Sequence, residues 1–369
     1  MAGKFMRCRF SDCSLEDPFF DSLKKDYPGF TEWYRKKAAL GAEAFVFTDA
    51  DGVCAFLYLK EDDDEQIDLK QGFLPRQKRL KIGTLKLTDR FQGQRLGEGA
   101  FGIALWRWQE LPVDEVYLTV FSHHADIIFL AEKFGFKCAG TLKSAEGQSS
   151  GDELLYVKRK SDIDYSDVYR AFPYIKPGFG YARMMPIKAG FHDRILPYSE
   201  LRYTEQEFWD EAAGNGMTKI FIGTPYSKLR WKVGDPVFIY RIHKDQKVRR
   251  YKSCITSFAT IAKIEYIKER CQALKGLDEF IKLCGNKTIF SEEELRRAYA
   301  KSQNLVMIEF VYNGFFGKGK NVIFKNLKDW GLFDTHPYDI EYTFREFAWI
   351  LKAGGKDVQN IVVDTSAVR

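Results

Sequence analysis

The chain has 369 residues, a length that corresponds to two or three domains, and its composition of 45% hydrophobic, 15% aromatic and 29% charged residues is that of a globular protein. This composition excludes collagen-like, coiled-coil and intrinsically disordered classes. Residues 1–160 are nearly neutral, with 24 Lys and Arg against 25 Asp and Glu, whereas residues 161–369 carry 33 against 26 and a net charge of about +7. An anionic partner for the second part is therefore plausible, although a solvated basic surface needs none.

The sequence contains no apolar run of about 18 residues and no secretory signal pattern at its start. We therefore expect a cytoplasmic protein that does not span a membrane. The seven cysteines are scattered and include no Cys-x-x-Cys pair, so the sequence predicts neither a disulfide framework nor a metal site.

Strands and helices alternate over the first 160 residues. A strand over 5–10 and helices over 18–25 and 31–40 precede two strand-like runs, 43–48 and 53–60. The turn at 49–52, Asp-Ala-Asp-Gly, predicts that these two strands pair antiparallel. We expect the acidic stretch 61–65 to form an exposed loop.

A glycine-rich segment follows the strand predicted over 80–88 and leads into a helix that reaches Trp108. Strand, glycine turn and helix in this order form a phosphate cradle, because glycine lets the backbone approach an anion and the N–H groups of the helix start point at it. A strand over 116–121, a helix over 125–134 and strands over 137–142 and 153–158 complete this half.

Residues 85–100 and 117–136 together resemble the GNAT acyltransferase superfamily. The glycine-rich match has two registers, the literal Gln94–Gly99 and the run Phe91–Gly97, in which Arg95 replaces a glycine. We favour the second, because it also puts Leu87 at the expected strand end. The sequence Glu-Lys-Phe-Gly-Phe at 132–136 supplies the other half of the match.

The resemblance implies transfer of an acetyl group from acetyl-CoA to an amine. It implies that backbone groups of Leu87 and Thr88 contact the pantetheine arm and the carbonyl oxygen. It also implies that the following loop and helix start hold the pyrophosphate, through Gln92, Gly93, Gln94, Arg95, Leu96, Gly97, Glu98 and Gly99.

The proton-transfer residues depart from the family pattern. Against the branch that acetylates protein amino termini, Thr119, His124 and Ala131 stand in place of a glutamate, an asparagine and a tyrosine. His123 and His124 are candidates for base or acid, because an unperturbed imidazole titrates near 6.5. Two alternatives stay open, namely that His124 only caps the helix by a hydrogen bond and that water replaces a dedicated base.

The second half begins after a predicted linker over 161–184, which is polar and then rich in Pro and Gly. Short strands with Gly-Asp turns suggest a small mixed barrel over 185–369, with helices over 273–284, 291–300 and 342–351. The runs 232–241 and 253–261 resemble PUA-like barrels, including the ASCH and EVE branches. That resemblance implies a surface that faces RNA or modified bases.

Clustered cations with interleaved aromatic residues are typical of nucleic-acid binding, because cations bind phosphates and rings stack on bases. The candidates are Lys228, Arg230, Trp231, Arg241, Lys244, Arg249, Arg250 and Lys252. The alternative is that Trp231 belongs to the barrel core and the lysines are solvated hairpin tips.

The sequence thus predicts a mixed α+β protein, with a GNAT-like mixed sheet and flanking helices over 1–160 followed by a PUA-like barrel. Its predicted function is acetyl-CoA-dependent acetylation of an amine linked to RNA or another nucleic acid. Two other functions remain open: a non-catalytic CoA-binding regulatory protein of antitoxin-like type, and a protein or small-amine acetyltransferase whose barrel docks a protein. Neither a protein partner nor a homodimer is decided by the sequence.

Overall fold

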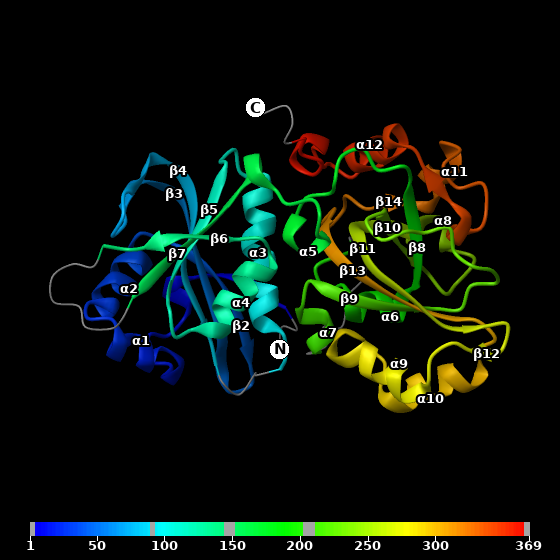
Figure 1. Cartoon of the computed structure of the whole chain (residues 1–369), viewed down its shortest axis with the longest axis horizontal. Helices are drawn as coiled ribbons and strands as arrows, with labels where there is room; N and C mark the ends of the chain where they lie inside the picture. The colour runs from blue at the N-terminus through cyan, green and yellow to red at the C-terminus, as the bar shows by residue number, and fades with distance from the viewer. Residues whose placement is uncertain (1–3, 89–92, 144–151, 202–210, 365–369) are drawn as a thin grey trace. The chain divides into compact units, whose positions relative to one another are not determined.

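The computed structural model describes residues 4–88, 93–143, 152–201 and 211–364 of a mixed α+β chain (Figure 1). The chain forms two compact units, Met1–Asp162 and Ile163–Arg369. Within the described residues, no helix combines the length and the apolar character that crossing a bilayer requires.

The first unit is built on a seven-stranded sheet in the order β1-β2-β3-β4-β5-β7-β6. All neighbours pair antiparallel except β4 and β5, which are parallel and therefore need the crossover helix α3 between them. The strands are β1 (Met6–Arg9), β2 (Glu43–Asp49), β3 (Gly52–Asp68), β4 (Phe73–Leu87), β5 (Glu115–Phe121), β6 (Lys137–Thr141) and β7 (Glu153–Arg159). The helices are α1 (Asp21–Asp26), α2 (Phe30–Ala39), α3 (Leu96–Glu110) and α4 (Ala125–Lys133).

Both faces of the sheet are covered by helices. Phe56 and Tyr58 of β3 pack with Phe30 and Tyr34 of α2, while α3 packs against β3, β4 and α4. Residues 53–59 of β3 are consequently buried without a break, as expected of a central strand that is covered on both sides.

The acidic stretch 61–65 is not the exposed loop that its charge suggested. It continues β3, which pairs with β4 as far as Asp68. Asp63 is buried there because Tyr117 donates a hydrogen bond to its carboxylate over 2.6 Å and the Lys60 ammonium lies 2.6 Å away. The ion pair with Lys60 and the hydrogen bond from Tyr117 make an acidic residue compatible with a strand interior.

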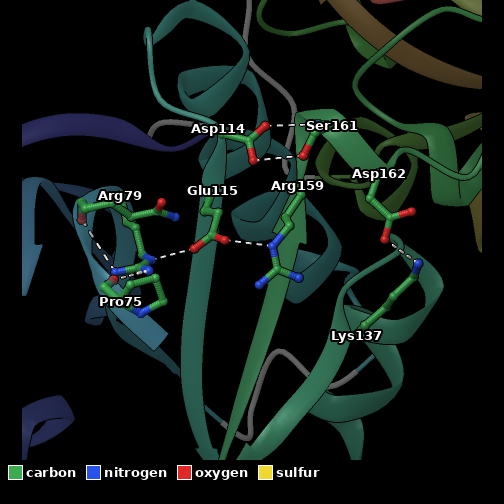
Figure 2. Close-up of polar contacts among 9 residues, drawn as sticks. Pro75, Arg79, Asp114, Glu115, Lys137, Arg159, Ser161 and Asp162 are labelled. Atoms are coloured by element: carbon green, nitrogen blue, oxygen red, sulfur yellow. Dashed lines mark hydrogen bonds and ion pairs between the residues drawn. The ribbon is translucent and has the colours of Figure 1, made fainter. Parts of the chain in front are cut away.

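A buried cluster of charges joins β4, β5 and β7 at one end of the parallel pair (Figure 2). Glu115 accepts hydrogen bonds from Arg79 Nε over 2.5 Å and from Arg159 Nε over 2.7 Å. The other nitrogens of Arg79 donate to backbone carbonyl groups, including that of Pro75 at 2.7 Å. Burial alone raises the pKa of Glu115, but the bonds from both arginines outweigh it, so the pKa lies below its usual value.

The second unit is built on an eight-stranded sheet whose main path is β15-β8-β10-β11-β13-β9, with β12 and β14 both paired to β11. The strands are β8 (Ala182–Lys188), β9 (Thr218–Gly223), β10 (Pro236–Ile242), β11 (Cys254–Glu269), β12 (Gln272–Ala273), β13 (Leu305–Phe315), β14 (Val322–Ile323) and β15 (Glu341–Tyr342). The helices are α5 (Val168–Ala171), α6 (Ala189–Ile195), α7 (Ala212–Asn215), α8 (Arg249–Lys252), α9 (Leu277–Cys284), α10 (Glu292–Lys301), α11 (Phe324–Asp329) and α12 (Phe344–Ala353).

Two apolar clusters hold the helices of the second unit to its sheet. Phe280 of α9 and Leu295 of α10 pack with Ile220 and Ile267, whereas Phe347 of α12 belongs to a larger cluster around β10 and β11. Most of the expected linker 161–184 belongs to this unit, because its apolar residues are buried in it and β8 begins at 182. Among the described strands, the path runs from β15 to β9 as a mixed sheet, and a PUA-like identity stays a prediction.

His192 lies at the centre of a buried polar network in the second unit. Its Nδ1 lies 2.8 Å from Asp193 Oδ1 and its Nε2 lies 2.7 Å from Thr256 Oγ1. Arg241 binds both carboxylate oxygens of Asp193, each over 2.8 Å. Burial lowers the pKa of His192 and outweighs the neighbouring Asp193 carboxylate, which raises it.

We expect Glu115→Gln to destabilise the first unit by about 3–5 kcal/mol, because it leaves two arginines without their buried counter-charge. The measurement is urea unfolding of the full chain. Asp162→Asn is the matched control, because Asp162 pairs with Lys137 at an exposed position (Figure 2) and should cost less than about 1 kcal/mol. Equal effects of the two substitutions would contradict the role given to Glu115.

The pH dependence of stability should depend on His192. The unfolded chain takes up a proton near pH 6.5, whereas the folded chain does so only at lower pH, so stability falls as the pH drops below about 6.5. Wild type should therefore lose stability relative to His192→Gln between pH 7.5 and 5.5, at up to about 1.4 kcal/mol per pH unit. Thermal unfolding measures this difference. His336→Gln, at an exposed position, should follow wild type.

Candidate functional site

The parallel strands β4 and β5 separate partway along their length. They pair from Arg79 with Glu115 to Ile82 with Leu118, and no further pair follows in the described residues. Both strands nevertheless continue, β4 to Leu87 alongside β3 and β5 to Phe121 alongside β7. The carboxyl ends of parallel strands meet at one edge of a sheet, so this separation opens towards that edge.

A β-bulge accounts for the separation. Tyr58 pairs with Thr84 and the next residue of β3 pairs with Ile82, which leaves Gly83 as the extra residue of β4. Bulges bend a strand and increase its local twist, and this one occurs at the residue after the last pair with β5. Glycine suits the position because a Cβ atom there would lie 3.1 Å from the Tyr58 ring.

The register of β3 and β4 decides which backbone groups face the gap. Thr88 donates its N–H to the Cys54 carbonyl over 2.8 Å, so the pair Ala55 and Leu87 is of the non-hydrogen-bonded kind. The backbone groups of Leu87, and of Leu85 two residues earlier, therefore point away from β3 towards the β5 side. The predicted contact of Leu87 with a pantetheine arm stays a prediction, and the Thr88 N–H, predicted to make the same contact, is bound to β3.

The start of α3 follows the β4 end of this gap. Gly93 and Arg95 both have positive φ, of 82° and 60°, and Arg95 is the N-cap of the helix. Arg95 thus has a backbone conformation that is usual for glycine. In the favoured alignment register of the glycine-rich run, Arg95 also stands where the resembled family has a glycine. The first helical bond runs from the Gly99 N–H to the Arg95 carbonyl, so the N–H groups of residues 96–98 precede the helical ladder and can face an anion.

The side chains of this segment have structural contacts. Glu98 is buried and accepts hydrogen bonds from Arg95 over 2.7 Å and from Lys133 of α4 over 3.2 Å. A Cβ atom on Gly97 would lie 2.9 Å from a Leu130 methyl group. Gln94 lies in the turn and is half-buried, Leu96 and Gly99 are buried in the first turn of α3, and Gln92 lies outside the described residues.

His123 and His124 follow the carboxyl end of β5, at the same edge as the end of β4. Both residues are exposed, and their rings lie 4.2 Å apart between centroids. His124 is the N-cap of α4, but its side chain makes no capping hydrogen bond. The open interpretation of His124 as a side-chain cap is therefore wrong.

The cations proposed to bind nucleic acid fall into two groups. Exposed Lys228 and Arg230 lie in the loop before β10, while Lys244, Arg249, Arg250 and Lys252 lie after it. In the chain, the two groups flank β10, a strand of seven residues that spans about 20 Å.

Two of the proposed nucleic-acid ligands are buried. Trp231 is 5% exposed and donates its indole N–H to the Tyr338 carbonyl over 3.1 Å. Arg241 is 4% exposed and holds Asp193. The prediction that these two side chains contact a nucleic acid is corrected, because burial removes them from the surface.

Several residues that shape these sites are not among those predicted from the sequence. The Gly83 bulge and Leu85 define the gap in the first unit, and a lone glycine within a strand is the signal that could have indicated the bulge. In the second unit, Lys325 and Lys328 of α11 lie beside Arg249 and Arg250 around one pocket. The two lysines lie about 75 residues after the arginines in the sequence, so no local pattern indicated that they share a pocket.

No protein family model and no curated protein matches this chain. Among solved structures, Ard1 from Thermoplasma volcanium is 14% identical over 42% of this chain and 97% of its own, with a TM-score of 0.31. A ribosomal-protein-alanine N-acetyltransferase from Brucella melitensis is 15% identical over 42% and 98%, with a TM-score of 0.32. ZmASCH from Zymomonas mobilis is 10% identical over 46% and 93%, with a TM-score of 0.31. Likenesses of this size assign neither a family nor an activity to the chain.

We expect Glu98→Gln to lower the stability of the first unit by about 1.5–3 kcal/mol, because Arg95 and Lys133 lose a charged hydrogen-bond acceptor. Lys133→Gln, whose side chain is partly exposed, should cost less than about 1 kcal/mol. Urea unfolding of both variants measures the difference. A fully stable Glu98→Gln variant would show that Glu98 does not fix the start of α3.

Proposed function

We propose that the first unit transfers an acetyl group from acetyl-CoA to an amine, and that the second unit selects an amine carried by RNA or another nucleic acid. The observation that carries the first part is the separation of β4 and β5 next to the start of α3. A chain with amide groups, such as pantetheine, can pair with the exposed edge of β4 as an added strand would. A diphosphate suits the N–H groups at a helix start.

The residues at this edge have distinct roles in the proposed reaction. Backbone N–H groups of Leu85 and Leu87 hold the pantetheine arm and polarise the thioester carbonyl, which favours negative charge on its oxygen. The amine then attacks the carbonyl carbon, a C–N bond forms and the C–S bond breaks. His123 or His124 takes the proton that the amine loses, and the departing thiolate takes up a proton from the other imidazole or from water.

Support for nucleic acid comes from the second unit and is of a different kind. Its exposed cations after β10 include Lys244, Arg250 and Lys252. Such side chains neutralise phosphates and make binding dependent on salt. The resemblance of residues 232–241 to PUA-like barrels supports the same class of partner.

The test is incubation of the full chain with isotopically labelled acetyl-CoA and either total RNA or a cell protein extract, followed by mass spectrometry. We expect label in a discrete RNA species. The double variant His123→Ala with His124→Ala should lose about 100-fold in turnover while it still binds acetyl-CoA in calorimetry. Phe129→Ala, at an exposed position of α4, is the matched control and should behave as wild type.

The other outcomes separate the alternatives. Label in protein would replace the nucleic-acid substrate with a protein amine. Acetyl-CoA binding without any label transfer would favour the non-catalytic regulatory protein, and absence of binding would overturn the proposal for the first unit. Unchanged turnover in the double histidine variant would remove both imidazoles from the mechanism.

A further inference from the structure

A cationic pocket lies between α8 and α11 of the second unit, which pack against each other. Four cationic residues line it, namely Arg249, Arg250, Lys325 and Lys328, together with Gln246 and Phe324. The described lining residues include no carboxylate. A neighbouring acid, Asp329, pairs with Lys325 and, over 3.8 Å, with Arg250. The lining residues themselves carry four cations and therefore a net positive charge.

Arg249 lies at the inner side of this pocket against aromatic rings. Its guanidinium carbon is 5.7 Å from the centre of the Phe324 ring, which in turn packs on Phe333 at 4.8 Å. Tyr240 packs on Phe333 at 5.1 Å and lies close enough for the charge of Arg249 to act on its hydroxyl group. These rings fix the guanidinium and exclude water from one side of it.

Two polar atoms here lack hydrogen-bond partners among the described residues. Arg249 Nε and the Tyr240 hydroxyl are both buried from solvent and have no hydrogen bond of good geometry, and the two side chains lie close enough together for Arg249 to lower the pKa of that hydroxyl. An unsatisfied buried donor costs about 1–3 kcal/mol, and more when it is charged. An acceptor oxygen bound in the pocket would remove that cost for Arg249.

The lining indicates the chemical class of that acceptor. A guanidinium presents several N–H donors to a phosphate, and lysines add point charges around it. Four cations exceed what a single carboxylate needs, whereas phosphates carry more charge and more oxygens. Phe324 lines the pocket as well and offers a ring on which an attached base can stack.

We propose that the pocket between α8 and α11 binds a phosphate group of a nucleotide, either free or within an RNA strand, through Arg249, Arg250, Lys325 and Lys328. The choice of RNA as one source rests on the function proposed above, while phosphate binding itself does not require acetyl transfer. The pocket would then hold the nucleic acid by its backbone and leave its bases to other contacts.

Fluorescence anisotropy with a labelled single-stranded 12-mer RNA tests the proposal on the full chain. Arg249→Gln, and separately Lys325→Gln with Lys328→Gln, should weaken binding about tenfold or more and reduce the slope of log affinity against log salt by about one for each lost contact. Lys301→Gln, at an exposed position in α10, is the matched control and should leave the affinity unchanged. Thermal unfolding verifies folding, and if Arg249→Gln does not fold, the lysine pair decides.

Competing ligands separate the two sources of phosphate. If AMP displaces the RNA at concentrations that match the dissociation constant of AMP measured directly, a free nucleotide is a ligand of the pocket. A preference for 5′-phosphorylated over 5′-hydroxyl RNA would identify a strand end, and equal binding of the two would identify internal phosphates. Absence of binding by RNA and AMP, or pocket variants that bind as wild type does, would overturn the proposal, whatever the acetyl-transfer assay gives.

Discussion

The pairing of β4 with β5 is the constraint on which the first unit depends. At one end, Glu115 holds Arg79 and Arg159 in a buried cluster, so the two parallel strands and β7 are fixed together (Figure 2). A few residues further on, the Gly83 bulge turns β4 away. The buried ion pairs and the bulge together fix where the pairing of β4 with β5 ends, while β4 stays paired with β3 and β5 with β7.

One group of buried charges in the second unit forms a closed network. His192, Asp193 and Arg241 satisfy one another, so their burial orders the sheet around them without leaving a free charge. Arg249 differs, because its Nε has no hydrogen bond of good geometry and the same pocket is lined by Arg250, Lys325 and Lys328. This contrast is the reason why Arg249, and not Arg241, is proposed to bind a ligand.

Much of the fold could be predicted from the sequence, because the relevant signals are local. The order of strands and helices, the turn after β2 and the helix that begins after Arg95 follow from periodicity and from glycine and capping residues close in the sequence. The motif of residues 93–99 also lies in one segment, so its place at the start of α3 was predictable. The acidic strand segment was not, because Tyr117, which accompanies Asp63, lies 54 residues away.

The sequence by itself determined most of the element types, the glycine-rich helix start and the positive charge of the second half. Only the tertiary structure decided that Trp231 and Arg241 are buried, that the Thr88 N–H belongs to β3, and that Lys325 and Lys328 share a pocket with Arg249. The physical reason is that burial, strand register and charge clustering depend on contacts between segments far apart in the chain. Composition and local spacing record which groups are present, and packing decides which of them meet a ligand.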